Sequence, residues 1–229
     1  MSGSLLVCAA ERMRTMEMMP LMAEKRSRGE VRNQKLRRVA ADLFLKRGYD
    51  GVSIDKIVEL AGGSKSTVYQ EFGGKCGLFI SSIEELCRES NAPLEKIDYA
   101  GRTLEESLKT IAVAILELVT SRRAVELHRL AVGEALHCPE VGEAWYTHGP
   151  VRTVSYIRSI FERHASEIDK DVGSLDQIAT AFYNALTGDV LSRLLAGITR
   201  RERPAELQGA AHATVELLLA GLSIQGSKR

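Results

Sequence analysis

The sequence predicts an all-α protein of about nine to ten helices, arranged as a short N-terminal helical domain and a longer C-terminal helical domain. Aromatic residues make up only 5% of the 229 residues, and long stretches are rich in the strong helix formers alanine, leucine, glutamate and arginine. Apolar residues recur at intervals of three and four, and no segment alternates convincingly with a period of two. Only five prolines interrupt the chain, which leaves room for long helices.

The composition is that of a folded protein, because 45% of the residues are hydrophobic and 27% are charged. The longest apolar runs have six residues, whereas a membrane-spanning helix needs about 20, so we expect no membrane partner. Leu5 to Ala10 is too short for a secretory signal and follows no basic residue, and residues 1–29 are expected to be a disordered N-terminal extension. Four cysteines without C-x-x-C spacing indicate free thiols in a reducing cytoplasm.

Charge is distributed unevenly, although the formal net charge is only +1. Residues 25–80 hold 12 Lys and Arg against 6 Asp and Glu, while residues 81–229 hold 17 against 21. The first part is therefore suited to a polyanionic partner. A basic helix that is merely solvated would have the same charge, so this interpretation depends on the motif within the region.

The basic region is predicted to contain short helices joined by glycine turns. The expected helices span 30–47, 54–61, 65–72 and 75–91. Ser53 and Ser64 are placed to cap the second and third helices, and glycine follows each of the first three. Asn91-Ala92-Pro93 is expected to end the fourth helix and to mark the junction between the domains, 32–92 and 95–222.

Residues 53–72 have the arrangement of a helix-turn-helix, in which the second helix enters the major groove of DNA. Gly62 lies in the three-residue turn, where it can take a backbone conformation that most residues avoid. Val68 and Phe72 can pack against the preceding helix. The remaining polar side chains of the second helix are expected to face outward, where they suit base edges and phosphates: Lys65, Ser66, Thr67, Tyr69 and Gln70.

Residue types and spacings across the four helices resemble the DNA-binding domain of the TetR/AcrR family. The matching residues are Ala40-x-x-Leu43-Phe44-x-x-x-Gly48-Tyr49, Ser53-Ile54-x-x-Ile57, Ala61-Gly62, Ser64-Lys65, Val68-Tyr69-x-x-Phe72-x-x-Lys75 and Leu78-Phe79. Two positions depart from the pattern. Gly63 stands where the family usually has a β-branched or small apolar residue, and Glu71 replaces a common aromatic residue, histidine or asparagine.

The resemblance implies a homodimeric regulator that binds a palindromic operator in double-stranded DNA and is released by a small-molecule effector. It implies phosphate contacts from Ser53 and Lys75 and a base-reading surface around Ser64–Gln70. Tyr69 can contact DNA or pack against the core. The basic side chains of the first helix could contact phosphates or simply be solvated: Arg32, Lys35, Arg37 and Arg38.

The C-terminal part is predicted to form helices at 103–121, 122–138, 140–148, 150–167, 174–198 and 205–222. Leu127-x-Arg129-Leu130 through Glu134-Ala135, Pro139 to Gly142 and Trp145-Tyr146-x-x-Gly149-Pro150 resemble an AefR-like subset of the same family. This likeness implies a ligand-binding and dimerisation domain without naming the ligand.

The last two helices have more apolar residues than one core can cover, so a partner helix is the economical cover. The resemblance implies a four-helix bundle across a twofold axis, although a fully internal helix of a monomer would also explain the pattern. The expected interface residues are Ala181, Ala185, Gly188, Leu191, Leu195, Val215, Leu218, Leu219 and Leu222.

A ligand pocket is expected among the aromatic residues of the C-terminal domain, with a few polar anchors. Each candidate could instead belong to the core or the surface. The candidates are His128, Glu134, Trp145, Tyr146, Phe161, Phe182 and Tyr183.

No catalytic arrangement is recognisable, so we expect no enzyme and no cofactor. His137-Cys138 has no second pair at metal-ligand spacing, so no metal site is expected. Cys76 and Cys87 could sense oxidation, but packing within helices explains them equally. The leading hypothesis is a ligand-responsive DNA-binding repressor. The alternatives are a small helical enzyme or ligand carrier, and the same fold acting as an activator or a redox sensor.

Overall fold

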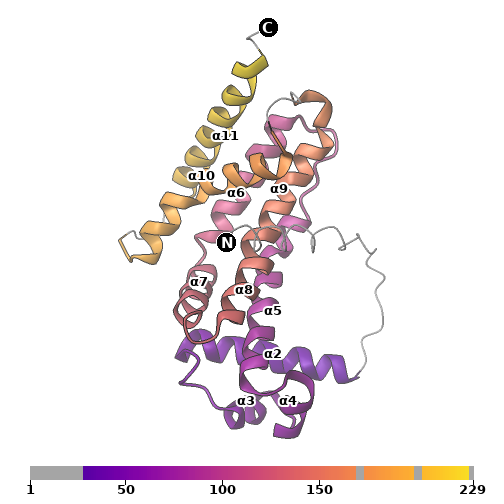
Figure 1. Ribbon diagram of the computed structural model, residues 1–229, viewed down its shortest axis with the longest axis vertical. Helices are drawn as coiled ribbons and strands as arrows, with labels where there is room; N and C mark the ends of the chain where they lie inside the picture. The colour runs from indigo at the N-terminus through magenta and orange to yellow at the C-terminus, as the bar shows by residue number, and fades with distance from the viewer. Residues whose placement is uncertain (1–27, 169–172, 199–202, 227–229) are drawn as a thin grey trace, which may run out of the picture. The chain divides into compact units, whose positions relative to one another are not determined.

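The computed structural model describes residues 28–168, 173–198 and 203–226, which are helices, turns and loops without a strand. The predicted all-α fold class is confirmed. The helices are α2 (Arg28–Arg47), α3 (Ile54–Ala61), α4 (Lys65–Phe72), α5 (Lys75–Glu95), α6 (Leu104–Val119), α7 (Arg122–Glu134), α8 (Pro139–Tyr146), α9 (Arg152–Arg163), α10 (Leu175–Leu195) and α11 (Pro204–Gly226), shown in Figure 1. Most of the predicted 1–29 extension lies outside the described residues, but 28 and 29 already belong to α2.

Helices α2 to α5 share one hydrophobic core, as their apolar spacing predicts. Phe44 of α2 packs on Phe79 of α5 with ring centroids 4.7 Å apart, and Tyr49 lies 5.0 Å from the same Phe79 ring. Ile57 of α3 and Val68 of α4 are fully buried in this cluster. Burial of these side chains fixes the two short helices, which would be marginal in isolation.

Helix α5 does not end at Asn91-Ala92-Pro93, so this prediction is wrong. The helix runs to Glu95 with Pro93 in its last turn. Asn91 is held by α9 and the preceding turn: its amide donates to the His148 carbonyl over 3.0 Å, and its carbonyl accepts from the Thr153 hydroxyl over 3.1 Å. Leu94 is also buried, so tertiary contacts keep the turn helical despite the missing proline N–H.

Helix α7 ends at Glu134 and not at the predicted residue 138. Pro139 occupies the first turn of α8, and the residue before a proline avoids helical geometry. Cys138 accordingly adopts φ −139° and ψ 87° and forms the boundary between the two helices. A π-helical turn at Thr147–Val151, around Pro150, then joins α8 to α9.

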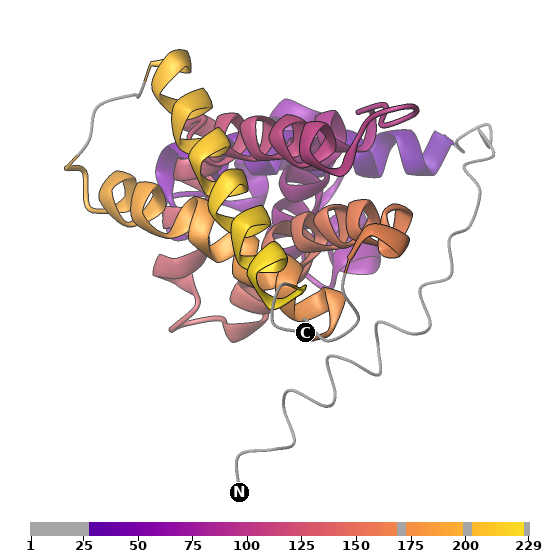
Figure 2. The same ribbon diagram turned by 90° about the horizontal axis from the view of Figure 1, so that it is seen from above.

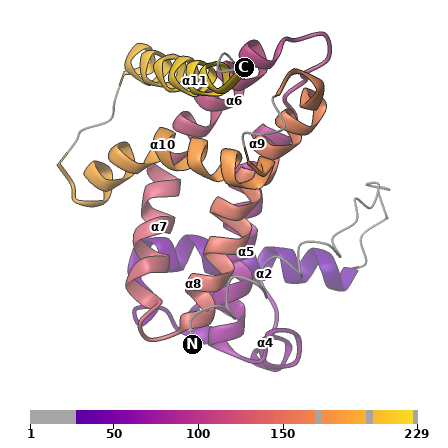
Figure 3. The same cartoon turned by 45° about the horizontal axis from the view of Figure 1, so that its top comes forward.

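A second core is formed by α6, α9, α10 and α11. Figure 2 shows α11 lying across α6, and the two helices pack closely. In Figure 3, α7 and α8 lie beside α5, which they also contact. Leu127, Ala131 and Val141 from α7 and α8 are buried in the core of α2 to α5. The N-terminal core is thus completed by residues beyond 92.

Candidate nucleic-acid interface and internal cavity

Helices α3 and α4 each begin at a capping serine. The Ser53 hydroxyl accepts from the Lys56 backbone N–H and the Ser64 hydroxyl from that of Thr67, both over 3.2 Å. Between the helices, Gly62 and Gly63 have φ angles of 74° and 131°, which residues with a Cβ atom rarely adopt. Gly63 departs from the family pattern, and the backbone conformation at this position explains why glycine is present.

The outward face of α4 carries four of the five predicted polar residues. Lys65, Ser66, Tyr69 and Gln70 are exposed. Thr67 is only 8% exposed, and its hydroxyl lies 3.1 Å from that of Ser64. The prediction that Thr67 faces outward is wrong, because this side chain shares the inner face with Val68.

Lys65 is paired within the helix-turn-helix. Its Nζ lies 2.7 Å from an Asp55 carboxylate oxygen on α3, and this hydrogen bond raises the pKa of Lys65 above its usual value. Both side chains are exposed, so water or another anion can easily replace Asp55 as the partner of Lys65. In the structure this pair places Lys65 at the edge of the polar face.

Lys75, at the start of α5, lies over an aromatic ring of the N-terminal core. Its Nζ is 4.1 Å from the centroid of Tyr49, whose ring packs on Phe79. A cation above the face of an aromatic ring is attracted by the ring electrons. The contact orients the ammonium group beside the first turn of α5, where the helix dipole also favours an anion.

Glu71, the second departure from the family pattern, is bound to α2. Its carboxylate accepts a 2.8 Å hydrogen bond from the side-chain amide of Asn33, which is only 8% exposed. The contact joins the C-terminal end of α4 to the first half of α2.

The four basic residues of α2 that the sequence proposed as contacts fall into two groups. Arg37 and Arg38 each lie 3.7 Å from the carboxylate of Glu85, which is 3% exposed, so they form ion pairs with a buried group on α5. Arg32 and Lys35 are exposed on the outer side of the helix. Of the four predicted residues, we therefore retain Arg32 and Lys35 as candidates for phosphate contacts.

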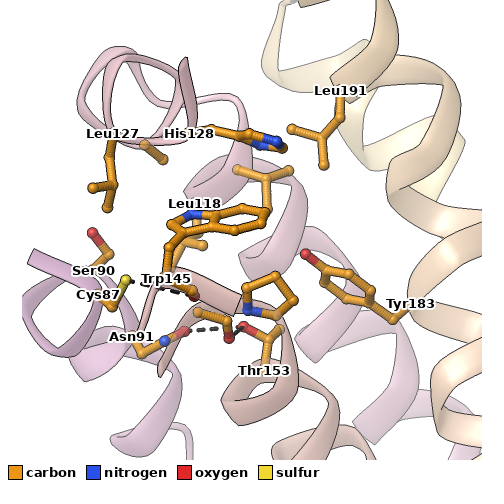
Figure 4. Close-up of a pocket in the computed structure, with 14 residues that line it drawn as sticks. Cys87, Ser90, Asn91, Leu118, Leu127, His128, Trp145, Thr153, Tyr183 and Leu191 are labelled. Atoms are coloured by element: carbon orange, nitrogen blue, oxygen red, sulfur yellow. Dashed lines mark hydrogen bonds between the residues drawn. The ribbon is translucent and has the colours of Figure 1, made fainter. Parts of the chain in front are cut away.

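A cavity of about 50 Å³ lies between α5, α6, α7, α8, α9, α10 and the turn at Thr147–Val151, as shown in Figure 4. This volume holds a few water molecules, since one needs roughly 10 to 15 Å³. The lining residues are Cys87, Ser90, Asn91, Leu118, Val119, Ala124, Leu127, His128, Trp145, Gly149, Pro150, Thr153, Tyr183 and Leu191.

Aromatic rings form one wall of the cavity. The rings of His128 and Trp145 have centroids 4.3 Å apart and are tilted by 39°, and Figure 4 shows them facing one another. Burial lowers the pKa of His128 and raises the pKa of Tyr183 to about 12. Burial, with a smaller effect of Glu84, likewise raises the pKa of Cys87 to about 12. Near neutral pH these groups are uncharged, so the cavity suits an uncharged molecule.

Three of the seven predicted pocket residues line this cavity, namely His128, Trp145 and Tyr183. Phe161 and Phe182 do not, because they are buried in the C-terminal core, and Tyr146 is 57% exposed. Glu134 also lies outside the lining.

Sequence reasoning missed the contribution of α5 to the cavity. Cys87, Ser90 and Asn91 line it from this helix, nearly 60 residues before Trp145 in the chain. The available signal in the sequence was an asparagine in line with the apolar stripe of α5, and in the structure Asn91 is only 2% exposed.

The outer face of α10 carries small exposed residues. Ala181, Ala185 and Gly188 are exposed, and Leu191 and Leu195 are partly buried at its end. A Cβ added at Gly188 would meet no atom within 4 Å. This face has room for close approach of another helix.

The predicted interface on α11 needs correction. Val215 is fully buried in the chain's own core and is not available to a partner. Leu218, Leu219 and Leu222 are partly buried against the same core. An exposed large apolar residue of this helix is instead Leu217, which is 76% exposed, and Ala210, Ala213 and Ala220 are exposed as well.

Within the part of the chain that the structure describes, no group of three or more histidine, cysteine or carboxylate side chains is placed to hold a metal ion. None of the described helices is both long and apolar enough to cross a membrane.

Two family models match the chain. One is described as bacterial regulatory proteins, tetR family, and matches residues 36–81; the other, AefR-like transcriptional repressor, C-terminal domain, matches residues 106–221. The first covers α3, α4 and most of α2, and the second covers the cavity wall from α6 to α10 and most of α11.

Among curated proteins, the chain is similar to the DNA-binding transcriptional repressor TetR of Mycobacteroides abscessus, with 34% identity over 58 residues. It is also similar to the uncharacterized HTH-type transcriptional regulator YdeS of Bacillus subtilis, with 37% identity over 58 residues. Each match covers 25% of this chain. The chain thus aligns with only 30% and 29% of the length of these two relatives.

Solved structures resemble the chain over most of its length. A putative TetR-family transcriptional regulator from Mesorhizobium loti has a TM-score of 0.69 and 25% identity, covering 85% of this chain and 98% of that one. The flavonoid-responsive regulator FrrA has a TM-score of 0.70 and 24% identity, covering 83% and 96%. The second likeness concerns the fold alone.

Proposed function

The chain belongs to the TetR family of bacterial transcriptional regulators, with an AefR-like C-terminal domain, and from this premise we propose a homodimeric repressor that a small molecule releases from its operator. The observation that carries the proposal is the exposed polar face of α4, set between two serine-capped helix starts and the lysine at the start of α5. Because its family consists of regulators, we propose that the protein has no catalytic activity. We also propose that it acts in the cytoplasm, where the bacterial chromosome lies.

DNA recognition is proposed to divide between two sets of residues. Ser66, Tyr69 and Gln70 lie on the exposed face of α4 and can reach base edges in the major groove, with Lys65 beside them. Lys75, Ser53 and Ser64 lie at helix starts, where backbone N–H groups and the helix dipole favour phosphate. Arg32 and Lys35 add positive charge along the phosphate backbone.

The proposed dimer pairs α10 and α11 with the same helices of a second copy. Ala181, Ala185 and Gly188 form a stripe of small exposed residues, which permits close approach of two backbones. Leu217 on α11 supplies an exposed apolar side chain that a partner would cover. A twofold dimer presents two copies of α4 to the two halves of an inverted repeat.

The proposed effector is a small, uncharged molecule with an aromatic ring. The cavity wall of His128, Trp145 and Tyr183 suits ring stacking, and burial keeps its titratable groups neutral. At about 50 Å³ the cavity is much smaller than the roughly 300 Å³ or more of typical ligand pockets, so binding requires it to widen. The flavonoid response in the name of FrrA is in keeping with this class of ligand.

Helix α5 is the proposed link between effector and DNA. The helix begins at Lys75, and its C-terminal half lines the cavity with Cys87, Ser90 and Asn91. A ligand that displaces Trp145 or breaks the Asn91 hydrogen bonds shifts this helix, and the shift reaches the first turn of α5. Ligand and operator then bind to different positions of one rigid element.

A direct test measures binding of the purified protein to duplexes from its own upstream region by fluorescence anisotropy. A fragment with an inverted repeat, its half-sites one helical turn or a multiple of about 34 to 36 Å apart, is expected to bind in a strongly salt-dependent manner. The matched control has one half-site scrambled and is expected to bind much more weakly. Equal binding to both duplexes, or binding indifferent to salt, would contradict the proposal.

A second test uses the chain's one tryptophan, Trp145, as a reporter inside the cavity. Titration with uncharged flavonoids is expected to quench its fluorescence and to release the operator at the same concentrations. A carboxylated aromatic of equal size is the control and is expected to bind far more weakly. Preference for the charged compound would contradict the proposed ligand class.

A further inference from the structure

Two cysteines from distant parts of the chain meet beside the proposed DNA-binding surface. The Sγ atoms of Cys76 and Cys138 are 3.1 Å apart, although the residues are separated by 62 positions in sequence. Cys76 lies in the first turn of α5, next to Lys75, and Cys138 is the residue that precedes α8. The sequence suggests Cys76 and Cys87 as possible sensors, whereas the pairing of Cys76 with Cys138 is visible only in the fold.

The two sulfur atoms lie close enough to bond with little movement. A disulfide requires about 2.05 Å between its sulfur atoms, so the pair has to approach by about 1 Å. Rotation of an exposed cysteine side chain can supply that distance, and Cys76 is exposed. Cys87, in contrast, is buried on the same helix and lines the internal cavity.

The surroundings of the pair give the two thiols different roles. Burial and hydrogen bonds with Cys76 and Glu140 raise the pKa of Cys138 to about 12, so its thiol stays protonated. Its thiol donates a hydrogen bond to a Glu140 carboxylate oxygen, with 3.4 Å between the sulfur and oxygen atoms. Cys76 is exposed whereas Cys138 is only partly exposed, so an oxidant in solution reaches Cys76 more readily.

We propose that Cys76 and Cys138 form an oxidation site that a peroxide closes into a reversible disulfide. The Cys76 thiolate attacks one peroxide oxygen, the O–O bond breaks, and sulfenic acid and hydroxide are formed. The Cys138 sulfur then attacks the Cys76 sulfur, an S–S bond replaces the S–O bond, and the released hydroxide takes up the Cys138 proton to leave as water. Two thiols and one peroxide give one disulfide and two waters, so the two electrons pass from sulfur to oxygen.

The disulfide ties the first turn of α5 to the boundary between α7 and α8. Lys75 precedes Cys76 directly, so the tether holds the proposed phosphate contact in one position and prevents it from adjusting to the DNA backbone. Resting on the proposed function, this step predicts that oxidation lowers operator affinity by about fivefold or more. The formation of the bond itself does not depend on that function.

The first experiment treats the reduced full-length protein with hydrogen peroxide and maps its peptides by mass spectrometry without a reductant. A peptide pair joined through Cys76 and Cys138 is expected, together with a melting temperature raised by about 5 to 10 °C and restored by dithiothreitol. Cys76→Ser and Cys138→Ser should each abolish both changes. Cys87→Ser is the control for the linkage and should leave the joined peptides intact.

Three other chemical outcomes of this experiment would contradict the proposed disulfide between Cys76 and Cys138. A disulfide between the Cys76 residues of two chains, a bond from Cys76 to Cys87, or sulfinic acid at Cys76 with Cys138 still reduced would each show that the pair does not close. Closure within one chain is concentration-independent, which a dilution series checks.

The second experiment compares operator affinity of the reduced and oxidised proteins by anisotropy, with Cys138→Ser under the same oxidation as control. About fivefold weaker binding of the oxidised protein, absent in Cys138→Ser and reversed by dithiothreitol, supports the regulatory step. Equal affinity with the linkage present overturns that step. If the reduced protein binds no operator, the proposed function fails, whereas the peptide map still decides whether the disulfide forms.

Discussion

Asn33 on α2 and Glu71 on α4 are joined by a 2.8 Å hydrogen bond from the side-chain amide to the carboxylate. Asn33 is nearly buried, so water competes poorly for this bond. Helix α4 has only eight residues and depends on such contacts for its orientation. An acidic residue on the proposed DNA-binding helix is thereby explained as a support of that helix.

Asn33→Ala is expected to lower the free energy of unfolding by about 1 kcal/mol, because Glu71 loses its shielded donor. Operator affinity should fall as well, since the end of α4 becomes loose. Urea denaturation measures the first effect and anisotropy the second. Lys35→Ala, on the exposed side of the same helix, is the control for stability and should change it by less than about 0.5 kcal/mol. An unaltered stability of Asn33→Ala would contradict the role of this bond.

The backbone of the helix-turn-helix could be predicted from sequence because its signals are local. Serine caps and glycine turns act within three or four residues, and Ser53, Ser64 and Gly62 have the predicted roles. Thr67 is buried beside Val68, and the pattern of polar residues in an eight-residue helix did not show this orientation. The Thr67 hydroxyl is hydrogen-bonded to the capping Ser64 hydroxyl and does not need solvent as a partner.

Elements whose state depends on distant partners could not be predicted. The last turn of α5 stays helical beyond Pro93 because Asn91 bonds to residues 57 and 62 positions later. Val215 shares an apolar helix with Leu217, but only the packing of α11 on α6 decides that the first is buried and the second exposed. An excess of apolar residues predicts that a partner exists without showing which face meets it.

Lys75→Ala and Gln70→Ala are expected to weaken operator binding in different ways. Loss of a phosphate contact from Lys75 should lower affinity for all duplexes and reduce the salt slope by about one. Loss of Gln70 should cost roughly 1 to 3 kcal/mol at particular base pairs and leave the salt slope unchanged. Anisotropy over a salt series and a panel of single-base operator variants separates the two. A Lys75→Ala protein with altered base preference would show that the roles are assigned wrongly.

Asp55→Asn is expected to strengthen operator binding by a few fold. The substitution releases Lys65 from its 2.7 Å ion pair and removes a negative charge beside the proposed DNA-binding helix. Stability should hardly change, because both side chains are exposed. The double variant Asp55→Asn with Lys65→Ala should lose most of the gain. Weaker binding of the single variant would indicate that Asp55 holds Lys65 in its DNA-bound position.

His128 is expected to make the protein less stable in mild acid. Burial lowers its pKa below the usual 6.5, so the unfolded chain binds a proton that the folded chain refuses. The stability present above pH 6.5 is therefore lost progressively as the pH falls toward the lowered value. Between pH 7 and pH 5, the melting temperature of His128→Gln should fall less than that of the unaltered protein. Parallel pH curves for the two proteins would show that His128 titrates without hindrance.

Ala185→Arg is expected to disrupt the proposed dimer. Ala185 is exposed in the single chain, so the substitution leaves the monomer core intact. Opposite a second copy, however, the long side chain would fill the space left by Ala181 and Gly188 and bury an unpaired charge, at a cost of several kcal/mol. Light scattering should report monomers at concentrations where the unaltered protein is dimeric.

Operator binding should collapse with the dimer, because each half-site then binds alone and the gain from two linked contacts is lost. Circular dichroism of Ala185→Arg should show the helical content of the unaltered protein, which separates loss of assembly from loss of folding. Ala165→Arg is the matched control, since Ala165 is exposed in the short turn after α9 and outside the proposed interface. That variant should remain dimeric and bind its operator normally. If Ala185→Arg also remained dimeric, the small residues of α10 would face solvent in the assembly, and the interface would have to lie on another surface.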